Sequence, residues 1–198
     1  MKSPISAPPA IHLTLPDWLH DFMDSDRRNL ETIESRMRLA IKLAALNVQH
    51  GSGGPFAALI ADMQTHRIIA AGVNRVASAN CSMAHAEMVA ISLAQQKLGS
   101  YDLGGAGFAK FELISSCEPC AMCFGALPWS GIRHLACAAR DEDARAIGFD
   151  EGPKHPDWRG ELEKRGIAVS TDICRDEARK VLTDYAATGG TIYNARQG

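Results

Sequence analysis

The sequence predicts an α/β fold of three layers, with helices on both faces of a central sheet. Two observations lead to this prediction. Apolar segments of helical and strand periodicity alternate along most of the chain, separated by turns that contain Gly or Pro. The 198 residues are 46% hydrophobic and 22% charged, which suits one globular domain with a single core.

The chain begins with a lead-in that precedes the domain. Residues 1–25 carry several early prolines and are expected to form an extended N-terminal segment, which three apolar side chains attach to the body: Trp18, Leu19 and Phe22. Residues 26–198 then form the domain. Its first helix is expected from the late twenties to His50, because apolar residues recur there at helical spacing.

Five short apolar runs predict the strands: 56–61, 67–73, 111–115, 132–138 and 166–170. Two helices are expected between them. One begins near His85 and ends at Gly99, and the other begins at Cys120 and stops before Pro128. Asp172 is expected to cap a last helix.

Charge and hydropathy argue against several classes of protein. The net charge is −2, so no broad basic surface for nucleic acid is indicated. No run has the length of a membrane span, and residues 1–16 do not resemble a signal peptide, which makes the cytoplasm the expected location. In that compartment the six cysteines favour metal binding or catalysis over disulfides.

Two short motifs predict a catalytic metal site. Cys120 and Cys123 are separated by two residues at the start of one helix, so their sulfurs can face one point, and His85 can add a third ligand from another helix. Three protein ligands leave the fourth position of a zinc ion open for water. Glu87 is then placed to act as general base and general acid.

Neither motif is specific alone, because Cys-x-x-Cys pairs are often structural or redox-active and His-x-Glu carries almost no information. Together they match the signature of the zinc deaminases. A non-catalytic zinc module is the alternative from another class of protein. Glu87 argues against it, because a structural metal site needs no proton shuttle.

Four segments resemble the cytidine and deoxycytidylate deaminase superfamily, in the branch of bacterial guanine deaminases and tRNA adenosine deaminases: Gly-Pro-Phe at 54–56, His-Ala-Glu at 85–87, Cys-Glu-Pro-Cys-Ala-Met-Cys at 117–123, and Gly-Ala at 125–126. The resemblance implies a cytidine-deaminase-like fold with a mixed five-stranded sheet. It also implies one catalytic Zn²⁺ per subunit and hydrolytic deamination of a nucleobase.

Two features resemble guanine deaminases in particular, and they imply conversion of guanine to xanthine and ammonia. Cys117 begins the Cys-Glu-Pro-Cys motif, where the tRNA enzymes usually carry an aliphatic residue. Glu151 follows Gly-Phe-Asp at the position of a second acidic residue, which contacts the purine amino group and is Asp in a related bacterial enzyme. Ammeline or related triazines are further possible substrates. The alternative activities are those of a tRNA adenosine deaminase and a cytosine deaminase.

The resemblance also implies a set of residues that bind the substrate. Asn74 would hold the edge of the base, Ala86 would contribute its backbone N–H, and Phe56 and Trp129 would stack on the base or wall it. Each has an ordinary alternative, since Asn is common in turns and aromatic residues are common in cores.

The C-terminal segment is expected to close the pocket through Tyr193, unless it is simply a frayed terminus. In one relative the partner subunit supplies this segment. The resemblance therefore implies a homodimer, with a possible exchange of C-terminal segments. A small nucleobase is the expected partner, with neither nucleic acid nor membrane.

Overall fold

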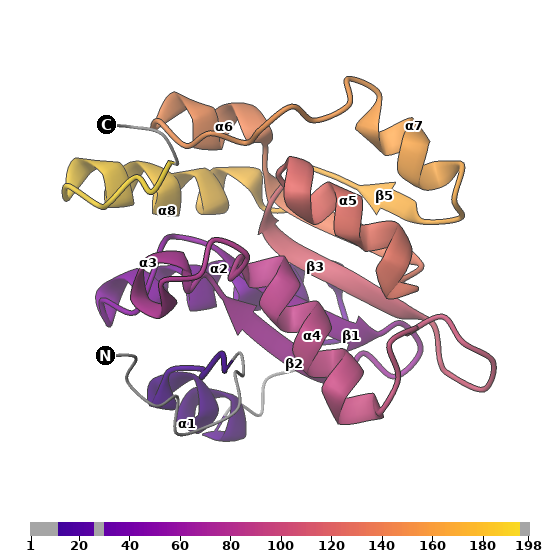
Figure 1. Ribbon diagram of the computed structural model, residues 1–198. Coiled ribbons are helices and arrows are strands. Elements are labelled where there is room, and N and C mark those ends of the chain that lie inside the picture. The colour runs from indigo at the N-terminus through magenta and orange to yellow at the C-terminus, as the bar shows by residue number, and fades with distance from the viewer. Residues whose placement is uncertain (1–11, 26–29, 195–198) are drawn as a thin grey trace, which may run out of the picture.

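The computed structural model describes residues 12–25 and 30–194 and contains a five-stranded sheet in the order β2-β1-β3-β4-β5 (Figure 1). The strands are β1 Ala57–Asp62, β2 Ile68–Val73, β3 Phe111–Cys117, β4 His134–Ala139 and β5 Ala168–Ser170. Strand β1 pairs antiparallel with β2 and β3, whereas β3, β4 and β5 run parallel. The mixed five-stranded sheet is therefore confirmed.

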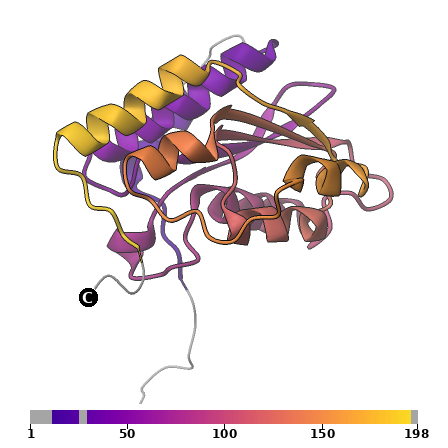
Figure 2. The ribbon, with the colours of Figure 1, turned by 90° about the horizontal axis from the view of Figure 1, so that it is seen from above.

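Helices cover both faces of this sheet, as the alternating segments predicted (Figure 2). They are α1 Asp17–Ser25, α2 Ile33–Gln49, α3 Val76–Ala79, α4 Ala86–Leu98, α5 Ala121–Ser130, α6 Asp141–Ala146, α7 Trp158–Glu163 and α8 Arg175–Ala187. Helices α2 and α8 pack on one face, and α4, α5 and α7 on the other. The adjacent residues Leu113 and Ile114 of β3 belong to different apolar clusters, because successive side chains of a strand point to opposite faces.

The strand register brings distant segments to one end of the sheet. Val73, the last residue of β2, pairs with Ala57, the first of β1, and Ala58 in turn pairs with Ser115 near the end of β3. Cys117 ends β3 and pairs with Ala139, the last residue of β4. Residues that adjoin these strand ends therefore meet at one place, although more than 60 positions separate Phe56 from Pro119.

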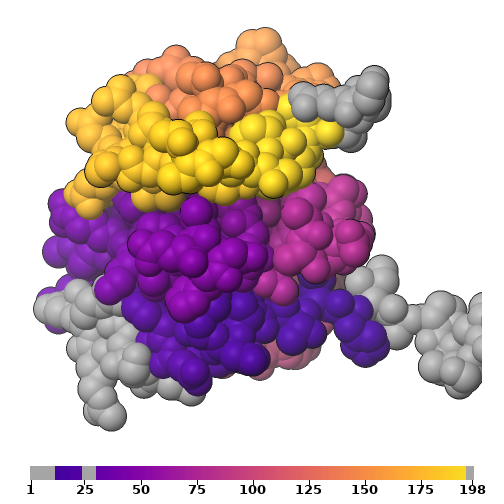
Figure 3. Space-filling model, turned by 90° about the vertical axis from the view of Figure 1, so that its left-hand side faces the viewer, coloured from indigo at the N-terminus to yellow at the C-terminus, as the bar shows by residue number. Residues whose placement is uncertain are grey.

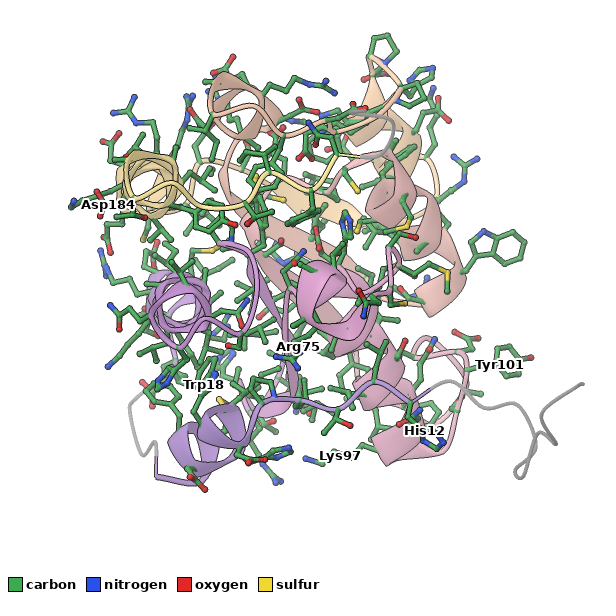
Figure 4. All side chains as sticks on the ribbon, turned by 60° about the vertical axis from the view of Figure 1, so that its left-hand side comes forward. His12, Trp18, Arg75, Lys97, Tyr101 and Asp184 are labelled. Atoms are coloured by element: carbon green, nitrogen blue, oxygen red, sulfur yellow. The ribbon has the colours of Figure 1, made fainter. Side chains whose placement is uncertain are left out.

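The N-terminal segment differs from the extended lead-in that the sequence predicted. Asp17–Ser25 forms helix α1, and Leu19 is 1% exposed within the main apolar cluster. The indole of Trp18, labelled in Figure 4, donates a hydrogen bond to Ser52 Oγ at 3.0 Å. In a helix, the apolar side chains of this segment lie on one face, and that face packs against the body. Residues 1–11 of the expected lead-in lie outside the described residues.

Two helix ends differ from the sequence prediction. Helix α5 continues through Pro128 to Ser130, and Gly131 ends it at φ 79°. The proline removes only one hydrogen-bond donor, and it does so in the last turn of the helix. Helix α8 begins after Cys174, and the expected cap residue Asp172 lies outside the helix, where it forms an ion pair with Arg140. In the described part of the chain, no helix is long and apolar enough to cross a membrane.

Candidate active site

Three residues predicted to bind metal come together at the ends of two helices. His85 precedes α4, Cys120 precedes α5, and Cys123 lies in the first turn of α5. His85 Nδ1 is 3.5 Å from the Cys120 Sγ and 3.7 Å from the Cys123 Sγ. All three candidate ligand atoms lie within 4.8 Å of one another. Because a helix N-terminus carries partial positive charge, both helices favour thiolates here.

The donor set and its spacing fit a zinc ion. Zinc binds imidazole nitrogen at about 2.1 Å and thiolate sulfur at about 2.3 Å in tetrahedral geometry, which separates N from S by about 3.6 Å. The two measured nitrogen–sulfur distances lie on either side of that value. The contact with Cys123 lowers the pKa of Cys120 to about 4, so this sulfur is ready to bind a cation as the thiolate.

Glu87 is the second residue of α4, two positions after His85, and it lines the cavity described below. Glu87 is buried, with 7% of its surface exposed. Burial raises the pKa of its carboxyl group, and the negative charge of Cys120 raises it further. A carboxyl group with a raised pKa can accept a proton and return it near neutral pH, as general acid–base catalysis requires.

A cavity of about 230 Å³ opens beside these residues. Its wall includes most of the predicted functional residues: His85, Glu87, Cys120, Asn74, Phe56, Glu151 and Tyr193. Cys123 is fully buried behind the wall. The sheet register explains the gathering, because Phe56 precedes β1 and Asn74 follows β2 at the same end of the sheet.

Glu151 reaches the cavity from the Glu151 loop, which we define as residues 147–157 between α6 and α7. The residue is 7% exposed, and its backbone carbonyl accepts a hydrogen bond from Ala121 N at the start of α5, at 2.9 Å. Burial raises the pKa of Glu151 to about 8, and the charges of Cys120 and Glu87 add to that rise. A pKa raised in this way lets the carboxyl group take up a proton closer to neutral pH than an exposed glutamate does.

The C-terminal segment, residues 188–194, closes one side of the cavity. Tyr193 is packed against the ring of Phe149, with ring centroids 5.0 Å apart, and its hydroxyl oxygen accepts a hydrogen bond from Asn74 Nδ2 at 2.7 Å. The Asn194 side chain bonds to Asp150 N and Gly148 O in the Glu151 loop. Figure 3 shows this yellow segment lying along the orange part of the chain.

Two predicted substrate-binding residues do not line this cavity within the described chain. Trp129 is 84% exposed on α5. Ala86 is fully buried in the cluster under α4, but as the first residue of that helix its N–H has no partner within the helix. The sequence reasoning also missed Phe149 and Asn194, which line the cavity. Phe149 lies in the Gly-Phe-Asp-Glu segment at 148–151, and its place two residues before Glu151 is the signal that could have identified it.

A histidine, two cysteines and a buried glutamate beside one cavity define a metal-dependent hydrolase of the zinc deaminase type. Residues 30–139 match the family described as "Cytidine and deoxycytidylate deaminase zinc-binding region", and the chain belongs to this family. The family's zinc-binding character agrees with the geometry of the three ligands.

Several relatives are similar over most of the chain. Guanine deaminase of Bacillus subtilis (strain 168) is 41% identical over 134 residues, covering 68% of this chain and 81% of the relative. The tRNA-specific adenosine deaminase of Buchnera aphidicola is 30% identical over 152 residues, covering 75% and 90%.

Solved structures show the same similarity to deaminases in three dimensions. The structure of the protein NE0047 in complex with 2,6-diaminopurine has a TM-score of 0.87 and 49% identity, covering 94% of this chain and 98% of that chain. Guanine deaminase from Nitrosomonas europaea has a TM-score of 0.86 and 47% identity, covering 90% and 97%. The cytidine-deaminase-like fold that the resemblance implied is thereby confirmed.

Proposed function

We propose that this protein hydrolyses guanine to xanthine and ammonia with one zinc ion held by His85, Cys120 and Cys123. One observation carries the proposal: His85, Cys120, Glu87 and Glu151 line one small cavity, and Tyr193 and Asn194 of the C-terminal segment border it on one side. The similarity to proteins named guanine deaminase, and to a structure that holds 2,6-diaminopurine, supports a purine base as the substrate.

The size of the cavity supports a free base over a nucleic acid. Its volume of about 230 Å³ is below the range of roughly 300–1,000 Å³ that is common for pockets of drug-sized ligands. Tyr193 and Asn194 of the C-terminal segment also line this cavity, which limits the space beside a bound base. The small cavity therefore favours guanine, or a triazine such as ammeline, as the substrate over the adenosine of a tRNA.

The proton-transfer roles follow from the two buried carboxyl groups. A bound zinc ion would supply Lewis acidity that makes a water molecule a better nucleophile near neutral pH. Glu87 takes the proton from the attacking water and delivers it to a ring nitrogen. Glu151 lies in the same cavity, where it can hydrogen-bond to the amino group. The second proton comes from the hydroxyl group that the water has added to the base. It passes through Glu87 or Glu151 to the amino group, which leaves as ammonia.

The other residues would hold the base flat. The Asn74 amide lines the cavity, which suits hydrogen bonding to the edge of the base. Ala86 does not line the cavity, and it would contribute its backbone N–H as the first residue of α4. Phe56 and Tyr193 supply aromatic walls. The exposed Trp129 could contribute only from a partner subunit, and the homodimer and the cytoplasmic location stay predictions from the sequence.

Ammonia release from purified zinc-loaded protein tests the proposal across guanine, adenine, cytosine, ammeline, their available nucleosides and a tRNA. We expect guanine to give the highest kcat/KM. Glu87→Gln, at unchanged zinc content, should lower kcat by about 10²–10⁴-fold. A wild-type protein that deaminates tRNA adenosine in preference to every free base would refute the proposal, as would a Glu87→Gln protein with full turnover.

A further inference from the structure

Lys154 is a buried cation beside the active site, and the mechanism proposed above gives it no role. Its side chain is only 7% exposed. Lysine is rarely buried to this degree without partners, because removing an ammonium group from water is costly. Lys154 lies three residues after Glu151 in the Glu151 loop, so its contacts bear on where that carboxyl group sits.

The Lys154 ammonium group joins the Glu151 loop to the segment that presents the metal ligands. It donates a hydrogen bond to the carbonyl oxygen of Pro119 at 3.1 Å, and Pro119 directly precedes the metal ligand Cys120. It also pairs with Asp141 Oδ2 at 2.9 Å and lies 3.6 Å from Glu118 Oε2. One side chain therefore connects the loop, the metal ligand segment and the start of α6.

A second connection lies close by. The carbonyl of Glu151 accepts a hydrogen bond from Ala121 N at 2.9 Å, and Gly152 packs so closely that an added Cβ would lie 3.0 Å from the Ala121 Cβ. Two hydrogen bonds thus flank Cys120, one at Pro119 and one at Ala121. Both come from the Glu151 loop, so a shift of the loop would change the distance between Glu151 and Cys120.

The need to neutralise nearby carboxylates does not by itself explain why the Lys154 ammonium group is buried here. Glu118 also pairs with Arg159 at 3.1 Å, and Asp141 also pairs with Arg145. Both carboxylates therefore have another cation. Within the described residues, Lys154 is the one side chain whose hydrogen bond to Pro119 O is resolved. The Lys154 ammonium also lies 4.9 Å from the centre of the Trp158 ring, which restricts its position.

We infer that Lys154 is a positioning residue for the deamination reaction: its hydrogen bond to Pro119 O and its ion pair with Asp141 hold the Glu151 carboxyl group at a fixed place relative to the metal ligands. This inference rests on the proposed function of the site. Lys154 acts through Glu151 and does not contact the substrate. Because displacement of a catalytic group by about 1 Å can lower a rate about 10²-fold, loss of this link should reduce turnover.

A double-mutant cycle between Lys154→Met and Glu151→Gln tests the inference. Alone, Lys154→Met should lower kcat by about 10–100-fold with zinc content unchanged. In the Glu151→Gln background the same change should lower the residual kcat by less than about threefold, because the group that Lys154 positions is already lost. Lys164→Met is the matched control, because Lys164 also forms an ion pair, with Glu161, but its side chain is 65% exposed.

Equal losses of kcat in both backgrounds would overturn the inference, because they would indicate a general structural role. An unchanged kcat in Lys154→Met, or a loss that follows zinc content, would overturn it as well. If Lys154→Met does not fold, Lys154→Gln is read by the same criteria. The cycle uses the base that the wild-type protein deaminates fastest, so inactivity toward guanine counts against the proposed substrate and not against Lys154.

Discussion

Replacing Glu112 with glutamine should destabilise the fold and leave catalysis intact. Glu112 lies near the start of β3 and is 2% exposed. Its carboxylate pairs with Arg36 Nε of α2 at 2.8 Å and contacts His134 Nδ1 of β4 at 2.9 Å. Arg36 also donates to the carbonyl oxygens of Leu30 and Glu31, so this carboxylate links α2 and the segment before it to the sheet.

The size of the effect follows from burial. Removing one partner of a buried ion pair costs about 3–5 kcal/mol, because the other charge stays buried without compensation. For a chain of 198 residues each kcal/mol corresponds to about 2–4 °C in Tm, so the expected loss is about 6–20 °C. Glu112 lies five residues before Cys117, or about 16 Å along the strand, so kcat at 25 °C should stay unchanged.

Thermal unfolding of the zinc-loaded protein measures this loss, with Glu177→Gln as the matched control. Glu177 also pairs with an arginine of α2, Arg38, but the two side chains are 48% and 57% exposed. The control should therefore change Tm by about 4 °C or less. A Glu112→Gln protein no less stable than this control would refute the reasoning, and so would a large fall in kcat at full zinc occupancy.

Three further outcomes are expected. Gly54→Ala should raise KM for guanine about tenfold without loss of zinc. The added Cβ would lie 2.9 Å from Tyr193 Cε1, so the tyrosine ring would have to move from its place in the cavity wall. An unchanged KM would show that Tyr193 does not touch the substrate. Removing the metal with a chelator should abolish ammonia release and lower Tm, and added zinc should restore both. The Arg175 guanidinium holds the pKa of Asp143 below its ordinary value, so this pair stabilises the fold above about pH 3.9. In urea unfolding, Arg175→Gln should therefore be less stable than wild type at pH 7, and the gap should close as the pH falls below about 3.9 through the folded-state pKa; a gap independent of pH would contradict this.

The metal ligands could be predicted from the sequence because their geometry is local. Cys120 and Cys123 are separated by one helical turn, and His85 and Glu87 stand at the start of another helix. Such spacing determines the direction of each side chain once the helix forms. The strands and the main helices were predictable for a similar reason, since burial of one face imposes its period on the sequence.

Helix ends were less predictable because neighbouring segments decide them. Asp172 is a good capping residue by type, yet Arg140, 32 positions earlier, takes its carboxylate in an ion pair. Pro128 is a good stop signal by type, yet α5 includes it in its last turn. Helix α1 likewise depends on its contact with the body, where Leu19 is buried and Trp18 bonds to Ser52.

By itself, the sequence was enough to propose the chemistry of the site, with a zinc-type donor set and a glutamate to move the proton, and to predict the α/β fold that carries them. Only the tertiary structure decided which other residues share the cavity. It placed Phe149 and Asn194 there, left Trp129 exposed, and put Lys154 between the Glu151 loop and Pro119. The physical reason is that ligand spacing is a property of a few consecutive residues, whereas a cavity wall is made by strand register and loop packing between segments far apart in the chain.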